Sequence, residues 1–76
     1  MLTVKLCKGD NQEYMKIVQT ARVDIYKRKV QGGLEVEVVT DDESFFVRPA
    51  SSKSGDFDNA YVENEHGATT QTIVPW

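Results

Sequence analysis

The chain has 76 residues, of which 39% are hydrophobic and 28% charged, and a formal net charge of −3. A chain of this length forms one small domain over residues 1–76 and buries only about 60% of its unfolded surface. Its single cysteine excludes an internal disulfide, and one cysteine with one histidine excludes a zinc site of four such ligands. Self-association often stabilises so small a core, so we expect a homo-oligomer.

The sequence has the features of a cytoplasmic protein. No stretch approaches the roughly 20 apolar residues that a membrane-spanning helix needs. The opening Met1-Leu-Thr-Val-Lys-Leu lacks the charged start and long apolar segment of a secretory signal. Together with the lone thiol, this predicts a protein of the reducing cytoplasm that does not contact a membrane.

In chain order, residues 2–7 form the first predicted strand, because Leu2, Val4 and Leu6 on one face alternate with Thr3, Lys5 and Cys7 on the other. Residues 8–11, Lys-Gly-Asp-Asn, predict a turn. Two structures fit the segment 11–21 that follows.

In the first, Tyr14, Ile17, Val18 and Ala21 have the spacing of one helix face, and the fold would be α+β. In the second, two strands meet at a kink at residues 19–20. Met15 and Ile17 face inward on the first strand, and Ala21, Val23 and Ile25 face inward on the second. We favour strands, because the flanking segments all have a period of two.

The central segment predicts a hairpin. Residues 22–30 form a strand that ends in Lys27-Arg28-Lys29, and Gln31-Gly32-Gly33 forms a turn in which glycine allows positive φ angles. The following Leu-Glu-Val-Glu-Val of residues 34–38 alternates strictly. It predicts a strand over residues 34–40 whose Leu34, Val36 and Val38 face the core, while Glu35 and Glu37 face water.

The last third of the chain predicts three further strands. An acidic turn at residues 41–44 precedes a strand at 45–48, which Pro49 ends. Residues 50–59 form a polar loop, and strands at 60–64 and 68–74 flank a turn at 65–67. The fold class is therefore all-β, a small barrel or curved antiparallel meander of five to seven short strands.

The sequence offers no complete catalytic or metal-binding set of residues. Cys7 and His66 form its only thiol–imidazole pair, and nothing near Cys7 in the sequence would lower the pKa of its thiol. Residues 56–59, Asp-Phe-Asp-Asn, lack the further ligands, the glycine and the distal glutamate of a calcium loop. We expect a non-enzymatic protein without metal or cofactor.

Charge is unevenly distributed and yields two hypotheses for binding. Residues 31–76 hold nine carboxylates and two cations, a net charge of −7, and their acidic face could dock a basic protein surface or mimic a nucleic-acid backbone. The acidic candidates are Glu35, Glu37, Asp41, Asp42, Glu43, Asp56 and Asp58. Residues 16–30 hold five cations and one carboxylate, a net charge of +4, and could bind nucleic acid. The basic candidates are Arg22, Tyr26, Lys27, Arg28 and Lys29.

Both hypotheses meet an objection. The sequence pI of about 5.0 opposes binding to a polyanion. Pairing across the predicted hairpin would instead neutralise Glu35 and Glu37 with Arg22, Lys27 or Lys29, and leave little acidic surface for a partner.

The layout resembles the short β-rich proteins that phages and prophages encode. The resemblance rests on the opening residues 1–6, the Ala21-Arg-Val-Asp-Ile-Tyr strand, and the closing hairpin Ala60-Tyr-Val-Glu-Asn with His66-Gly and Thr72-Ile. It implies a compact, often oligomeric interaction protein. Its partner would be a host protein, host nucleic-acid machinery or a small nucleotide signal of a defence system.

Overall fold

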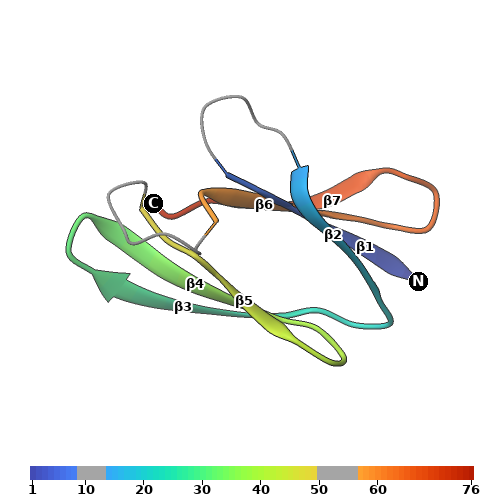
Figure 1. Ribbon diagram of the computed structural model, residues 1–76, viewed down its shortest axis with the longest axis horizontal. Helices are drawn as coiled ribbons and strands as arrows, with labels where there is room; N and C mark the ends of the chain where they lie inside the picture. The colour runs from blue at the N-terminus through green and yellow to red at the C-terminus, as the bar shows by residue number, and fades with distance from the viewer. Residues whose placement is uncertain (9–13, 50–56) are drawn as a thin grey trace.

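The computed structural model describes residues 1–8, 14–49 and 57–76, and in these ranges the chain forms seven strands and no helix (Figure 1). The strands are β1 (Leu2–Cys7), β2 (Tyr14–Thr20), β3 (Asp24–Val30), β4 (Gly33–Val39), β5 (Ser44–Val47), β6 (Asn59–Glu63) and β7 (Thr69–Ile73). The predicted all-β class is confirmed. The helix considered for residues 11–21 is replaced by β2 over Tyr14–Thr20, and residues 11–13 lie outside the described ranges. No helix among the described residues is long and apolar enough to cross a membrane.

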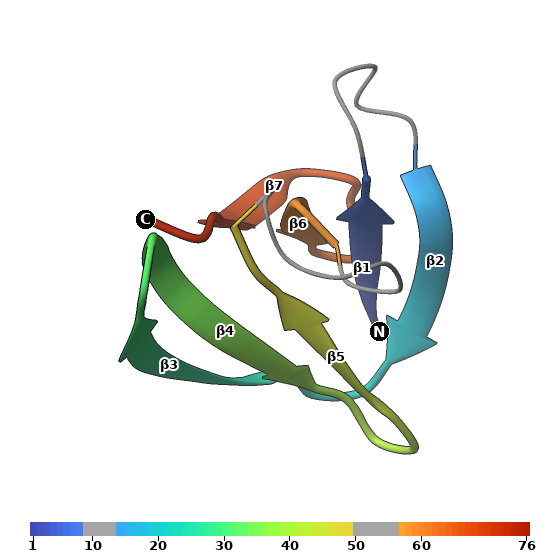
Figure 2. The same ribbon diagram turned by 60° about the vertical axis from the view of Figure 1, so that its left-hand side comes forward.

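The strands form two antiparallel sheets that face each other without closing into a barrel (Figures 1 and 2). One sheet has the order β2-β1-β6-β7, and the other is the simple meander β3-β4-β5. Residues 21–23 join β2 to β3, so the chain changes sheet within three residues. The kink therefore lies just after the predicted residues 19–20, which are still part of β2.

The core fills the space between the sheets and draws residues from both. Every second residue of a strand points inward. The buried apolar residues are Val4, Leu6, Cys7, Val36, Val38, Val47, Ala60, Val62 and Ile73. The predicted inward face of residues 34–38 is confirmed: Val36 and Val38 are fully buried, and Leu34 packs against the cluster. The exposed face of the same strand is left for polar residues.

Three side chains lie opposite to the prediction, and one of them is Ala21, which is exposed in the segment between β2 and β3. Ile17 is 56% exposed, because it pairs with Lys5, whose neighbours Val4 and Leu6 point into the core. Cys7 is fully buried although Leu6 beside it is also buried. A shift in the β1–β2 register between these two residues breaks the alternation there.

The corner between the sheets is held by hydrogen bonds to the β4–β5 turn. The buried Thr20 hydroxyl donates to the carbonyl oxygen of Arg22 at 2.9 Å and accepts from the N–H of Asp41 at 3.0 Å. The Ala21 N–H donates to the Asp41 carboxylate at 2.7 Å. Thr20 and Asp41 thus satisfy backbone groups that the bend would otherwise leave without partners.

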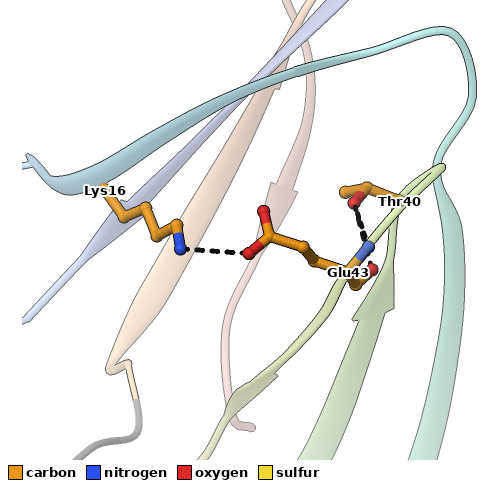
Figure 3. A network of polar contacts seen from close by, with 3 residues as sticks. All are labelled: Lys16, Thr40 and Glu43. Atoms are coloured by element: carbon orange, nitrogen blue, oxygen red, sulfur yellow. Dashed lines mark hydrogen bonds and ion pairs between the residues drawn. The ribbon is translucent and has the colours of Figure 1, made fainter.

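A second contact between the sheets joins β2 to the turn between β4 and β5 (Figure 3). The ammonium group of Lys16 on β2 lies 3.3 Å from the Glu43 carboxylate and 4.9 Å from the centre of the Phe45 ring. The Glu43 backbone is fixed in turn by the side chain of Thr40, which donates to its carbonyl oxygen at 3.0 Å. The exposed Lys16–Glu43 pair adds little stability, but it occupies the Glu43 carboxylate.

The last residues lie against the start of β4. The Leu34 N–H donates to the carbonyl oxygen of Pro75 at 2.9 Å, and Pro75 is buried. Figure 2 shows the C-terminus beside the β3–β4 turn, where Gly32 and Gly33 have φ angles of 92° and 151°. The predicted glycine turn is therefore confirmed, and it also makes room for the C-terminal segment.

Candidate functional site

The outward face of the β3-β4-β5 sheet brings together charged and aromatic side chains from three strands. Its rows follow from the register, in which Tyr26 and Phe46 pair with Glu37, and Arg28 pairs with Glu35. Side chains directly opposite each other on an antiparallel sheet lie within contact distance. We call this surface the outer face and define it by Tyr26, Arg28, Glu35, Glu37, Phe46 and Arg48.

In one row of the outer face, two arginines neutralise the carboxylate of Glu35. The guanidinium of Arg28 lies 2.9 Å from one oxygen of Glu35, and that of Arg48 lies 2.9 Å from the other. The two arginines cover Glu35, whose side chain is only 16% exposed although it points away from the core. The sequence predicted a water-facing Glu35, whereas the structure gives it two partners from either side of β4.

The neighbouring row is different, because its carboxylate has no partner among the described residues. The side chain of Glu37 makes no hydrogen bond or ion pair there. Aromatic rings stand on either side of it, Tyr26 on β3 and Phe46 on β5. The ring of Phe46 carries the Arg48 guanidinium, 4.2 Å from its centre, whereas Tyr26 is 59% exposed.

The outer face is concave. It encloses an open hollow of about 480 Å³ that is lined by Tyr26, Lys27, Arg28, Glu35, Glu37, Phe46 and Arg48. A smaller hollow of about 220 Å³ lies beside the corner between the sheets, against Arg22 and Asp41. The larger hollow combines exposed aromatic surface with both signs of charge, which suits recognition of a polar side chain.

Most of the predicted acidic surface is occupied by contacts within the chain. Glu35 is held by two arginines, Glu43 by Lys16 (Figure 3), and Asp41 by the Ala21 N–H. Glu37 and the exposed Asp42 make no ion pair among the described residues. Of the acidic candidates that the structure describes, only these two are therefore left for a partner.

The two remaining acidic candidates lie away from this face or outside the described residues. Asp56 falls outside the described ranges. Asp58 donates its backbone N–H to the carbonyl oxygen of Cys7 at 2.9 Å, and it has a further interaction as well. Asp58 is not among the residues that line the hollow of the outer face.

The predicted basic cluster lies only partly at the outer face. Tyr26 and Arg28 belong to the outer face, and Lys27 lines the same hollow, although it pairs with the core-facing Val36. Arg22 lies before β3 and pairs with Asp24 at 3.2 Å. Of the five candidates, Arg22 and Lys29 therefore lie apart from the hollow. The expected pairing of Glu35 with Lys27, Lys29 or Arg22 is replaced by pairing with Arg28 and Arg48.

Sequence reasoning missed Phe46 and Arg48 as site residues. Their spacing of two within the predicted strand 45–48 already placed both side chains on one face. Pairing this strand with the preceding one through the short acidic turn would also have placed Phe46 opposite Glu37. The register of the strands, and not the composition of the chain, determines which side chains meet on the outer face.

The thiol and the imidazole do not meet in this fold. Cys7 pairs with Asn59 at one end of β1, whereas His66 lies in the turn beyond Glu63, which pairs with Thr3 near the other end. Burial raises the pKa of the Cys7 thiol above its usual value of 9.0, which nearby Lys5 partly offsets. Among the described residues, no group of three His, Cys, Asp or Glu side chains is placed to hold a metal ion.

Comparison with known proteins gives no relative. No family model, no curated protein and no solved structure matches the chain. The outer face must therefore be interpreted from its own chemistry.

Proposed function

We propose that the chain is a small non-enzymatic binding protein that contacts a partner protein through the outer face. The observation that carries the proposal is the exposed Tyr26 beside Arg28 and Arg48 in an open hollow. Tyrosine and arginine are the residues that most often dominate the energy of protein interfaces, typically near the centre of the contact.

The centre of the outer face favours a protein over a nucleic acid. Glu35 and Glu37 lie in the middle strand of the sheet, and both arginines are already engaged by Glu35. A phosphate backbone would meet the unneutralised Glu37, and affinity for nucleic acid depends on cations that are available to phosphates. Of the two exposed lysines of β3, Lys27 lines the hollow and Lys29 does not.

The resemblance to phage-encoded β-rich proteins extends this proposal to a host protein of the cytoplasm. The alternative function, nucleic-acid binding, would use Tyr26, Lys27 and Arg28 at the hollow together with Lys29 and Arg22. A small nucleotide signal is a further ligand in keeping with the resemblance. Each of these ligands would give a different result when partners are captured from cells.

The test compares two variants that remove similar exposed apolar surface from opposite sheets. Tyr26→Ser alters the outer face, and Ile17→Ser is its matched control, since the two residues are 59% and 56% exposed. Tagged proteins are used to capture partners from cells that carry the gene, with and without nuclease. We expect a nuclease-resistant protein partner that Tyr26→Ser loses and Ile17→Ser retains.

Other results would refute the proposal. Equal capture by both variants would exclude the outer face as the contact surface. A partner that disappears with nuclease, together with direct binding to single-stranded DNA or RNA at low salt, would favour the nucleic-acid alternative. A retained nucleotide in native mass spectrometry of the purified protein would favour a small-molecule ligand.

A further inference from the structure

Glu35 and Glu37 lie on the same face of β4, but their carboxylates differ in whether the described residues provide a cationic partner. Glu35 is bound by two guanidinium groups, each at 2.9 Å. Glu37, two residues further along β4, has no cationic partner within the described residues. Arg28 and Arg48 are directed to Glu35, and Lys27 also lines the hollow, but none of these three cations forms an ion pair with Glu37.

The surroundings of Glu37 are suited to a cation. The ring of Tyr26 lies across the β3–β4 ladder from it, and that of Phe46 lies across the β4–β5 ladder. Aromatic faces attract cations, and a carboxylate next to a ring adds direct charge attraction. Arg48 already demonstrates this chemistry on the Phe46 ring, at 4.2 Å from the ring centre. Tyr26, by contrast, is exposed.

We infer that Glu37 and Tyr26 form a subsite for one lysine or arginine side chain of the partner protein, an inference that rests on the proposed function. The cationic group would be held by the Glu37 carboxylate, and its aliphatic stem would lie on the Tyr26 ring. The hollow of about 480 Å³ has room for such a side chain. The partner segment therefore carries a basic residue at this position.

The probe is a capped pentapeptide of four glycines with a central arginine or lysine, and the control peptide has glutamine at the centre. Binding to the ¹⁵N-labelled full chain is followed by NMR shift changes at about 20 mM salt, where exposed charges are weakly screened. We expect the basic peptides to shift the Glu37 and Tyr26 signals, and the glutamine peptide to leave them unchanged.

Two charge-removing variants locate the binding. Glu37→Gln should weaken binding of the arginine peptide by about tenfold, which corresponds to the loss of one charge-assisted contact of about 1.4 kcal/mol. Asp42→Asn is the matched control, since Asp42 is exposed and also lacks an ion pair among the described residues. It should leave the affinity unchanged. Folding of Glu37→Gln is checked by its dispersed NMR spectrum.

Three results would overturn the inference: no shift with either basic peptide, equal binding of the glutamine peptide, or equal binding of the arginine peptide by Glu37→Gln and the wild type. If capture of the partner depends on Tyr26 but not on Glu37, the proposed function stands and the subsite is refuted. If the basic peptide binds at Glu37 but partner capture is independent of Tyr26, the proposed function fails and with it the assignment of the cation to a partner.

Discussion

Replacing Gly33 with alanine tests how closely the C-terminal segment is built onto the β3–β4 hairpin. A Cβ atom at this position would lie 2.2 Å from the carbonyl oxygen of Pro75 and 3.4 Å from Cγ of Pro49. The Pro75 oxygen also accepts the hydrogen bond from the Leu34 N–H at 2.9 Å. The oxygen therefore cannot move away from the new methyl group without losing this bond.

The other glycines with positive φ angles provide the scale for the effect. A Cβ added to Gly67, whose φ angle is 82°, would have no neighbouring atom within 4 Å, so alanine there costs only the backbone conformation, about 1–2 kcal/mol. Gly33→Ala has a comparable backbone cost. It also removes the Leu34–Pro75 hydrogen bond and leaves a donor unsatisfied, which adds about 1–3 kcal/mol. We expect Gly33→Ala to destabilise the fold by about 2 kcal/mol more than Gly67→Ala.

Urea unfolding followed by far-UV circular dichroism measures the difference at one fixed protein concentration. An extra loss of about 2 kcal/mol also lowers the melting temperature of a domain of this size by roughly 8–16 °C. Gly32→Ala is a second control. It has a φ angle of 92°, and its nearest contacts, at 3.9 Å from Pro49, are ordinary van der Waals distances.

Removal of residues 75–76 separates the two contributions. Without the Pro75 oxygen, Gly33→Ala should cost no more than Gly67→Ala. The reasoning is refuted if the two alanine variants are equally stable in the full chain, or if the extra cost of Gly33→Ala persists after the truncation.

Three further predictions concern stability. Thr20→Val should lower the free energy of unfolding by about 1–3 kcal/mol, because the Asp41 N–H loses its acceptor. Exposed Thr72→Val should change it by less than about 0.5 kcal/mol, and equal effects would contradict the assignment. Glu35→Gln should cost about 1 kcal/mol at low salt and less at about 1 M salt, and a salt-independent loss would exclude the two ion pairs as its cause. Burial raises the pKa of the Cys7 thiol above its unfolded-state pKa of 9.0. The protonated thiol therefore contributes its full stabilisation of the fold below pH 9.0, and this stabilisation is lost as the pH rises through the higher folded-state pKa. The stability of the wild type relative to Cys7→Ala should therefore fall above pH 9.0, and a constant difference would argue against it.

The strands themselves were predictable because their causes are local. Alternation of apolar residues marked β1 and β4, and paired glycines marked the turn between β3 and β4. The inward direction of Val36 and Val38 followed from the same alternation. Most strand boundaries agree with those predicted to within about two residues, as expected where turn residues punctuate the chain.

The errors arose where the outcome depended on pairing with a distant strand. Ile17 was predicted to face inward from its own segment, but its direction is set by its register with Lys5 on β1. The partners of Glu35 could not be assigned from charge alone, because they depend on which residues of the flanking segments lie beside it. The candidate site is therefore a property of the β3-β4-β5 register, and composition alone could not reveal it.

The central pair of the four-stranded sheet has a consequence for the order of folding. β1 and β6 pair directly although the whole β3-β4-β5 meander lies between them in the chain. Meander contacts are local, whereas the β1–β6 ladder must close a loop of about 50 residues, which is entropically costly. The hairpins β1–β2 and β6–β7 are each marginal until they meet. We expect conservative substitutions at Val38 to slow folding, and those at Val4 and Val62 to speed unfolding instead, in stopped-flow measurements.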